Sequence, residues 1–338
     1  MLHFVIVAVL VALSTFGLGT YFASGALLPD AASQQSVIID WLFGVHGWLV
    51  AFFFSLIVVF LLYSVIVFRR RPGEQGDGVY LTGNHQLEII WTVIPLALVL
   101  WLAVIGARTL ADVERRDPDA MVVEVFAAQW SWSFQYENGA ITTDLVLPVD
   151  RQVLLRLHSN DVIHSFYVPE FRVKQDVLPG GPEFTRELRI TPTKQGAFKI
   201  QCAEICGQLH YDMLADVLVV SEGEFLTWLD QAGGECEGSD ELCGERWAQQ
   251  AGCLSCHSLD GTVVLGPSWL GLAGSQEELA DGSTVTVDAD YLKRSILEPN
   301  AQIVAGFNPG IMPRDFGVRL TEVQIDQIVA FILSLGEE

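Results

Sequence analysis

Apolar residues gather near the start of the chain, and polar residues dominate the rest. Residues 41–68 contain no charged side chain except that of His46, and they exceed the roughly 20 residues that a membrane-spanning helix needs. A second uncharged run, 89–107, contains Pro95, which a membrane helix tolerates where neighbouring helices satisfy the freed backbone groups. The pattern predicts a transmembrane helical hairpin over residues 37–110.

A third apolar segment occupies residues 1–28, and its fate is open. Ala23-Ser24-Gly25 could be a signal-peptidase site, but the positively charged region that precedes most signal peptides is missing. The segment is a transmembrane helix or a signal peptide, and we favour the retained helix. Arg69-Arg70-Arg71 separates the two spans of the hairpin, and such a loop is expected on the cytoplasmic side. Everything after Arg108 should then lie outside.

Short apolar and alternating runs, several of them β-branched, characterise residues 119–222. Turn residues such as Pro148, Pro169 and Gly180-Gly181 separate them. This spacing is typical of a β-sandwich or Greek-key β-barrel. The runs that we expect to form strands are 121–126, 152–158, 197–201 and 215–220.

Soft metal-binding side chains are concentrated in one segment of this β region. Cys202, Cys206, His210 and Met213 lie close together, and His164 lies upstream. Thiolate, thioether and imidazole donors together suit copper better than magnesium, calcium or manganese. Two bridging thiolates with one histidine per metal would hold a pair of copper ions, which is an electron-transfer site. The alternative is a disulfide between the two cysteines beside a buried histidine and methionine.

The segment resembles the CuA loop of cytochrome c oxidase subunit II, which reads C-x-E-x-C-x3-H-x2-M. The resemblance implies a cupredoxin-like Greek-key β-barrel and a Mg²⁺ ion that the carboxylate of Glu204 shares with subunit I. It also implies the ligands of the binuclear copper centre. These are His164 and His210 as terminal ligands, Cys202 and Cys206 as bridges, and Met213 and the backbone carbonyl of Glu204 on the individual copper ions.

Three further stretches resemble the same family. The stretch 84–95 matches the start of the second subunit II helix and implies that protons enter subunit I near Glu88, although an acid in a first helical turn also interacts well with the helix dipole. Trp130 matches the tryptophan through which electrons enter, but it also begins an alternating aromatic run that could simply pack one face of a strand. Residues 171–180 match a contact with subunit I, or form an ordinary charged loop.

Cys253-Leu-Ser-Cys256-His257 is the attachment signature of c-type haem. Each cysteine would form a thioether with a vinyl group of a covalent haem c, and His257 would lie beneath the iron. The surroundings resemble class I cytochromes c, in which the carbonyl of Pro267 accepts the N–H of the proximal histidine and Met312 is the distal ligand. The resemblance implies an all-α cytochrome c domain over residues 244–338, and His/Met ligation raises the haem potential.

The polar residues 223–243 read as a linker between the two extramembrane domains. Within them, Cys236 and Cys243 form a small disulfide loop or remain free thiols. Sequence alone does not decide their pairing.

The whole chain thus resembles subunit II of a haem–copper cytochrome c oxidase with a fused cytochrome c domain. The resemblance implies a multi-pass protein of the bacterial plasma membrane with its copper and haem domains on the periplasmic face. Electrons would enter at haem c and pass through CuA to subunit I, where oxygen is reduced to water and protons are translocated. The expected partners are subunit I, other oxidase subunits, and a donor that is a cytochrome c, a copper protein or a quinol-oxidising complex.

Charge and motifs weigh against other classes of protein. The acidic C-terminal domain would attract a basic donor protein, although a generally acidic proteome would give the same composition. In either case the net charge of −22 argues against nucleic acid. A quinol oxidase subunit II lacks the copper ligands, and nitrous oxide reductase contains a propeller whose repeats this chain does not have. A copper-binding or copper-sensing module would leave the haem motif unexplained.

Overall fold

The computed structural model describes residues 1–73, 80, 82–233, 236, 238–314 and 316–336. By internal contacts the chain forms two compact units. The membrane unit comprises residues 1–31 and 35–115, and the extramembrane unit comprises residues 32–34 and 116–338.

Three helices form the membrane unit: α1 (Leu2–Ala23), α2 (Gln34–Val67) and α3 (His85–Val113). Within the described residues, each is long and apolar enough to cross a bilayer. Most of their large apolar side chains are exposed, as lipid-facing side chains are. The side chain of Asn84 caps α3 by accepting the backbone N–H of Leu87 at 3.2 Å. The predicted hairpin of residues 37–110 lies within α2 and α3.

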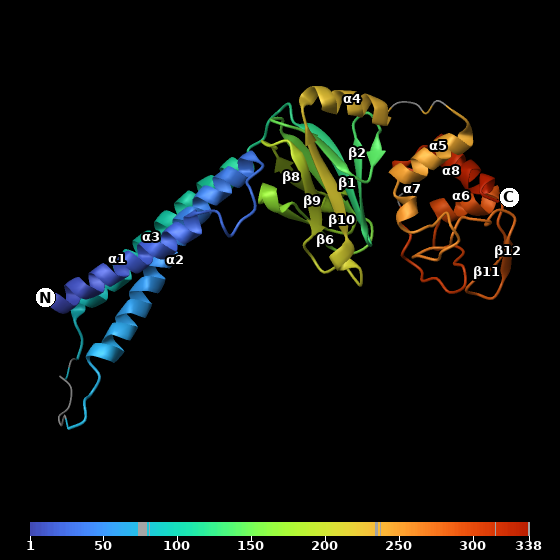
Figure 1. Ribbon diagram of the computed structural model, residues 1–338. Helices are drawn as coiled ribbons and strands as arrows, with labels where there is room; N and C mark the ends of the chain where they lie inside the picture. The colour runs from blue at the N-terminus through green and yellow to red at the C-terminus, as the bar shows by residue number, and fades with distance from the viewer. Residues whose placement is uncertain (74–79, 81, 234–235, 237, 315, 337–338) are drawn as a thin grey trace. The chain divides into compact units, whose positions relative to one another are not determined.

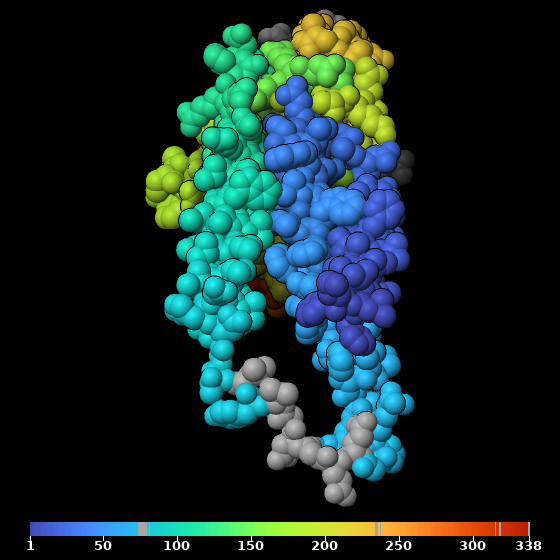
Figure 2. Space-filling model, turned by 90° about the vertical axis from the view of Figure 1, so that its left-hand side faces the viewer, coloured from blue at the N-terminus to red at the C-terminus, as the bar shows by residue number. Residues whose placement is uncertain are grey.

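Helix α1 packs against α2, as Figure 2 shows in dark and lighter blue. A Cβ atom on Gly19 would lie 2.2 Å from the ring of Trp48, so only glycine permits this approach. Nearby, the hydroxyl of Ser55 donates to that of Ser14 at 3.0 Å. Small residues and hydroxyl contacts of this kind are typical of paired membrane helices. Retention of α1 as a membrane span stays a prediction. Such a span would pack on the surface of α2 that contains Trp48 and Ser55.

The β domain of the extramembrane unit has two five-stranded sheets, which can be followed in Figure 1. Their strand orders are β3-β2-β1-β5-β8 and β4-β10-β9-β6-β7. Crossing connections make β1 pair in parallel with β5 and β10 with β4, so the domain is a cupredoxin-like sandwich, as predicted. The strands are β1 (Met121–Ala128), β2 (Ser131–Tyr136), β3 (Ile141–Thr142), β4 (Leu145–Pro148), β5 (Val153–Ser159), β6 (His164–Tyr167), β7 (Lys174–Val177), β8 (Arg186–Ile190), β9 (Gly196–Cys202) and β10 (Leu214–Val220).

Side-chain alternation places the core of the β domain between its sheets. In β1, buried and partly exposed residues alternate along most of the strand, which matches the two-residue period of a half-buried strand. In β2, Trp132, Phe134 and Tyr136 are all buried. The predicted aromatic face therefore exists for these three residues, whereas Trp130 precedes the strand.

The cytochrome c domain follows as helices around a buried apolar cluster. Helices α5 and α8 cross closely at Gly244, where a Cβ atom would lie 1.9 Å from the carbonyl oxygen of Gln327. Thr321 begins α8 with a reciprocal capping box. A two-stranded hairpin adds to the expected all-α architecture. The elements are α5 (Asp240–Gln250), β11 (Gln276–Glu278), β12 (Thr284–Thr286), α6 (Ala289–Leu297), α7 (Phe316–Arg319) and α8 (Glu322–Ser334).

The prediction of a linker over residues 223–243 is wrong for most of that range. Helix α4 (Glu222–Gly233) covers the β domain with the fully buried Phe225, and the amide of Asn138 donates to the carbonyl of Leu229 at 2.6 Å. Although most of its residues are polar, α4 has one apolar face, which is enough for a surface helix. Residues 234, 235 and 237 lie outside the described residues. Cys236 and Cys243 form a disulfide, which confirms the expected loop.

Candidate copper and haem sites

Strand pairing brings the copper-ligand candidates together. His164 begins β6 and Cys202 ends β9, and these two strands pair with Phe166 opposite Cys202. Cys206 and His210 lie in the loop after β9, which turns through a short 3₁₀ helix, His210–Asp212. Only the antiparallel pairing of β6 and β9 closes the long sequence gap between the upstream histidine and the cysteine segment.

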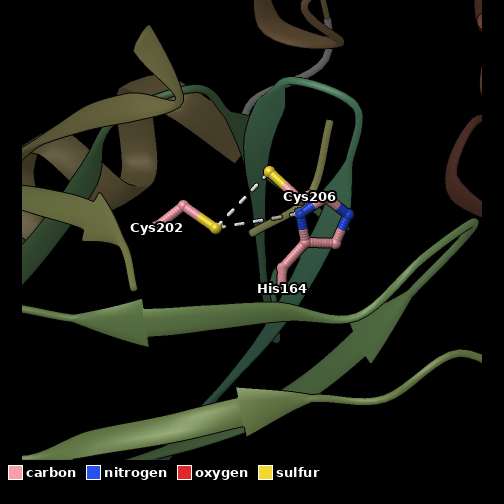
Figure 3. Close-up of side chains that lie close together, drawn as sticks. All are labelled: His164, Cys202 and Cys206. Carbon is pink, nitrogen blue, oxygen red and sulfur yellow. Dashed lines mark hydrogen bonds between the residues drawn. The ribbon is translucent and has the colours of Figure 1, made fainter. Parts of the chain in front are cut away.

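The donor atoms form one compact cluster, part of which Figure 3 shows. The two cysteine Sγ atoms are 3.7 Å apart, and Cys202 Sγ lies 4.0 Å from Nδ1 of His164 and 3.3 Å from the carbonyl oxygen of Glu204. Cys206 Sγ lies 3.5 Å from Nδ1 of His210 and 3.7 Å from Sδ of Met213. The cluster thus unites every side chain and carbonyl that the sequence suggested.

This donor set fits soft metal ions. Ligands at about 2.0–2.3 Å from a shared ion lie roughly 3–4 Å from each other, which is the spacing found. His164 and Met213 are fully buried, and Cys206 is nearly so, so the donors face a water-poor interior. The disulfide alternative for Cys202 and Cys206 is not the state seen, because their 3.7 Å separation far exceeds the roughly 2.05 Å of a bonded pair.

Asp161 orients His164, although no motif in the sequence singled it out. Its Oδ1 accepts Nε2–H of His164 at 2.7 Å, which leaves Nδ1 directed toward Cys202. The backbone N–H groups of Gln129 and Val162 also donate to this carboxylate, each at 2.6 Å. Burial acts to raise the pKa of Asp161, but these hydrogen bonds outweigh it and hold the pKa below its usual value. The sequence did contain a signal for this role, because an acidic residue lies close to a candidate metal-binding histidine.

The two thiols differ in acidity. Burial acts to raise the pKa of Cys202, but hydrogen bonds from His164 and from the backbone at Glu204 and Ser165 lower it to about 6. Burial and the adjacent Cys202 thiolate raise the pKa of Cys206 to about 12. Cys202 is therefore the more readily deprotonated thiol, and a metal that binds both sulfur atoms must displace a proton from Cys206.

Trp130 lies against the same loop. Its indole N–H donates to the carbonyl of Cys206 at 3.2 Å, and the side-chain amide of Gln129 donates to the same oxygen at 2.6 Å. Gly207 makes room for this contact, because a Cβ atom there would lie 3.0 Å from the Trp130 ring. The exposed Glu204 leaves its carboxylate at the surface of the loop.

The haem-attachment residues line one cavity, whose wall also includes residues of strands β1 and β2 of the β domain. Cys253, Cys256 and His257 share its walls with Pro267 and Met312, and most of the remaining lining side chains are apolar. These residues suit a covalent haem, because both cysteines and both candidate iron ligands border the same space. The expected ligands His257 and Met312 are thus brought to one cavity from distant parts of the sequence.

His257 is held in a defined orientation. Its Nδ1–H donates to the carbonyl of Pro267 at 2.8 Å, as expected, and its ring stacks on Trp269 with centroids 5.0 Å apart. Burial lowers the pKa of His257, although the hydrogen bond to Pro267 acts in the opposite direction. Burial therefore favours the neutral imidazole, which is the form that binds iron. Gly266 allows this packing, because a Cβ atom there would lie 2.6 Å from Cε1 of His257.

The other two family-like stretches supply none of the clustered donor atoms or haem-attachment residues. Glu88 is in the first turn of α3 in the membrane unit, is 48% exposed, and lies 3.9 Å from Nδ1 of His85. Residues 171–180 contain strand β7, so they are not simply a loop, and in this strand Lys174 donates to Asp176 at 2.6 Å. The hydroxyl of Ser165 also donates to that carboxylate. These bonds hold the pKa of Asp176 below its usual value. Ser165 directly follows His164, so this network joins β7 to β6 next to a candidate copper ligand.

Known proteins share all three parts of the chain. Residues 22–108 match the transmembrane domain of cytochrome c oxidase subunit II, residues 139–220 match its periplasmic domain, and residues 243–336 match cytochrome c. Cytochrome c oxidase subunit 2 of Bacillus sp. (strain PS3) is 32% identical over 80% of this chain and 80% of its own length. The proteins of the same name from Alkalihalophilus pseudofirmus and Thermostichus vulcanus are 34% and 31% identical, each over 66% of this chain, and the matches cover 68% and 83% of their own lengths.

These matches imply a copper site in the β domain, a haem in the C-terminal region, and other oxidase subunits as partners in a membrane-bound oxidoreductase. The chain therefore belongs to the cytochrome c oxidase subunit II family and carries a cytochrome c domain.

Proposed function

We propose that this chain receives electrons for a haem–copper oxidase at its cytochrome c domain and passes them through the copper cluster to subunit I. Oxygen reduction and proton translocation would take place in that partner. The donor would be a cytochrome c, a copper protein or a quinol-oxidising complex. Both extramembrane domains would lie on the periplasmic face, because the arginine-rich loop at residues 69–71 favours the cytoplasm.

In this proposal two cofactors are held by the chain's own side chains. A binuclear copper centre would be bridged by Cys202 and Cys206, and a covalent haem would be attached at Cys253 and Cys256. When bound, both groups exchange single electrons without making or breaking bonds. The remaining copper ligands would be His164, His210, Met213 and the carbonyl of Glu204, and the iron ligands would be His257 and Met312.

One observation carries the proposed relay between the haem and copper sites. A single surface hollow is lined by Trp130 on the copper side and by Ser255, Cys256 and Leu265 on the haem side. Trp130 in turn donates its indole N–H to the backbone of Cys206, a proposed copper bridge. The haem-attachment turn and the copper loop therefore approach each other through this tryptophan, as a relay requires.

Spectroscopy and kinetics test the proposal on the purified oxidase complex. We expect a mixed-valence two-copper EPR signal, a low-spin c-type haem band, and haem oxidation that keeps pace with copper reduction after rapid photoreduction. Trp130→Phe should slow that step, whereas the matched Trp228→Phe, whose ring packs on Tyr136 instead, should not. A folded, haem-loaded complex without the copper signal would overturn the proposal.

Two finer roles belong to the same proposal. The exposed carboxylate of Glu204 would bind Mg²⁺ together with subunit I, and Glu204→Gln should weaken Mn²⁺ bound in its place, as seen by EPR. Protons would enter subunit I beside Glu88, so Glu88→Gln should slow proton uptake more than haem-to-copper electron transfer. Equal slowing of both processes would count against the role of Glu88.

Met312 is the proposed distal ligand of the iron. It borders the haem cavity and packs against the cytochrome core. Met312→Leu should lower the haem potential and remove the sulfur-to-iron absorption band, because a thioether ligand raises the potential. Retention of that band would assign Met312 to the core alone.

A further inference from the structure

Arg319 is a buried arginine where the cytochrome domain meets the β domain. It ends α7, its residue is 6% exposed, and it borders the haem cavity together with Cys253. A buried guanidinium needs hydrogen bonds or aromatic faces around it, because removing its charge from water is costly. Its neighbours therefore indicate what it does.

The guanidinium contacts both domains at once. Nη2 donates to the hydroxyl of Ser133 in β2 and, at 3.4 Å, to the carbonyl of Ala251, two residues before Cys253. Its Cζ lies 5.5 Å from the ring centroid of Phe126 in β1 and 5.3 Å from that of Phe316 in α7. Two contacts thus come from the β domain and two from the cytochrome domain, and the planar arginine satisfies both sets.

An apolar contact lies beside this polar one. Ile141 of β3 is 2% exposed and belongs to the same buried cluster as Trp247 and Ala248 of α5. A Cβ atom on Gly252, next to the haem-attachment turn, would lie 3.5 Å from Thr143. The edge of the β2–β3 hairpin therefore packs against the segment that leads into Cys253.

We propose that Arg319 anchors the cytochrome domain on the β domain and so holds the haem-attachment turn opposite Trp130. It is a positioning residue for electron transfer, and this role rests on the proposed function. Small interfaces between domains permit relative motion by default, and a central buried arginine is a common way to restrict it. In the step that it supports, one electron leaves the reduced haem iron and one electron reduces the copper pair.

The test uses the full oxidase complex with Arg319→Gln, Ser133→Ala and the double variant. We expect Arg319→Gln to slow haem-to-copper electron transfer by roughly tenfold or more, with Ser133→Ala less severe, because loss of positioning weakens the coupling. The double variant should be no slower than Arg319→Gln if both side chains act through one contact. Arg294→Gln, which alters an exposed arginine of the same domain, is the matched control and should leave the rate unchanged.

A second readout separates this proposal from the direction of electron flow. Pulsed EPR between the oxidised copper pair and the low-spin haem should give a narrow distance distribution that broadens in Arg319→Gln, whether or not electrons take this route. Unchanged haem and copper spectra would show that both sites remain intact.

The outcomes are decisive in each case. A wild-type rate and a narrow distribution in Arg319→Gln would overturn the proposal. If Arg319→Gln fails to retain haem, Ser133→Ala and Phe126→Leu decide. Both positions border the haem cavity, but each change alters only a β-domain partner of Arg319 and leaves the haem-attachment residues and candidate iron ligands in place. A broadened distribution in these variants supports anchoring, and an unchanged one overturns it. Unchanged distributions in all variants, with no transfer even in the wild type, would refute both proposals.

Discussion

The copper and haem sites are built in opposite ways. The copper donors lie within 3.3–4.0 Å of their neighbours and close on one another, with strands β6 and β9 beneath them. The haem residues instead border a cavity whose walls come from many parts of the cytochrome domain and from strands β1 and β2. His257 is fixed by Pro267 and Trp269, and Met312 borders the same cavity.

The two domains therefore obtain their stability from different contacts. The β domain buries a continuous core between two sheets, so its metal site is an addition to a complete structure. The cytochrome domain leaves many apolar side chains facing one cavity, and dispersion contacts there depend on the haem. Removing the cofactor should therefore have a large effect on one domain and a small effect on the other.

The largest expected effect is loss of the cytochrome fold without haem. The double change Cys253→Ala and Cys256→Ala should abolish protection of α5 and α8 in hydrogen exchange, because the lost contacts rival the total stability of a domain, about 5–15 kcal/mol. Strands β9 and β10 should keep their protection when copper is removed instead. Equal loss of protection in both domains would break the comparison.

The next effect concerns the preformed copper cluster. Asp161→Asn replaces the carboxylate that orients His164, and we expect copper affinity to fall by about 10–100-fold. Competition with a copper chelator measures the change. Asp230→Asn, an exposed carboxylate on α4, is the control and should bind copper normally. Normal affinity in Asp161→Asn would show that strand pairing alone orients the histidine.

A smaller effect is expected from a single added methyl group beside His257. Gly266→Ala would place Cβ 2.6 Å from Cε1 of His257. We expect the free energy of unfolding to fall by about 1–3 kcal/mol and the haem spectrum to change. Thermal unfolding followed in the haem band measures it. Gly223→Ala, where nothing lies within 4 Å, should be nearly neutral. An unchanged spectrum in Gly266→Ala would mean that the ring can move without cost.

The smallest effect is a pH dependence of the copper-free cluster. The Cys202 pKa of about 6 lies below the roughly 8.5 of an unfolded thiol. The Cys202 thiolate therefore stabilises the folded state above about pH 8.5, and this stabilisation is lost as pH falls through about 6. The raised pKa of Cys206 acts in the opposite direction at alkaline pH. Thiolate absorbance of the haem-loaded, copper-free protein should rise near pH 6, and Cys202→Ser should abolish that rise.

Local sequence was sufficient where the chemistry lies within a few residues. The copper loop from Cys202 to Met213 and the haem motif at Cys253–His257 each contain enough ligands to be read directly. The spans α2 and α3 followed from uninterrupted apolar runs, because a bilayer demands length and apolarity rather than specific partners. Local composition gave a wrong prediction at α4. Burial of Phe225 stabilises a helix there, although the segment is polar and contains glycine.

Neighbours along the chain were therefore enough to predict the candidate ligand types, the long apolar helices and the β character of the middle region. Only the tertiary structure decided that Asp161 orients His164, that Trp130 contacts the backbone of Cys206, and that Arg319 contacts Ser133. Strand pairing and domain packing bring these residues together from remote parts of the sequence. No local sequence pattern therefore predicts their contacts.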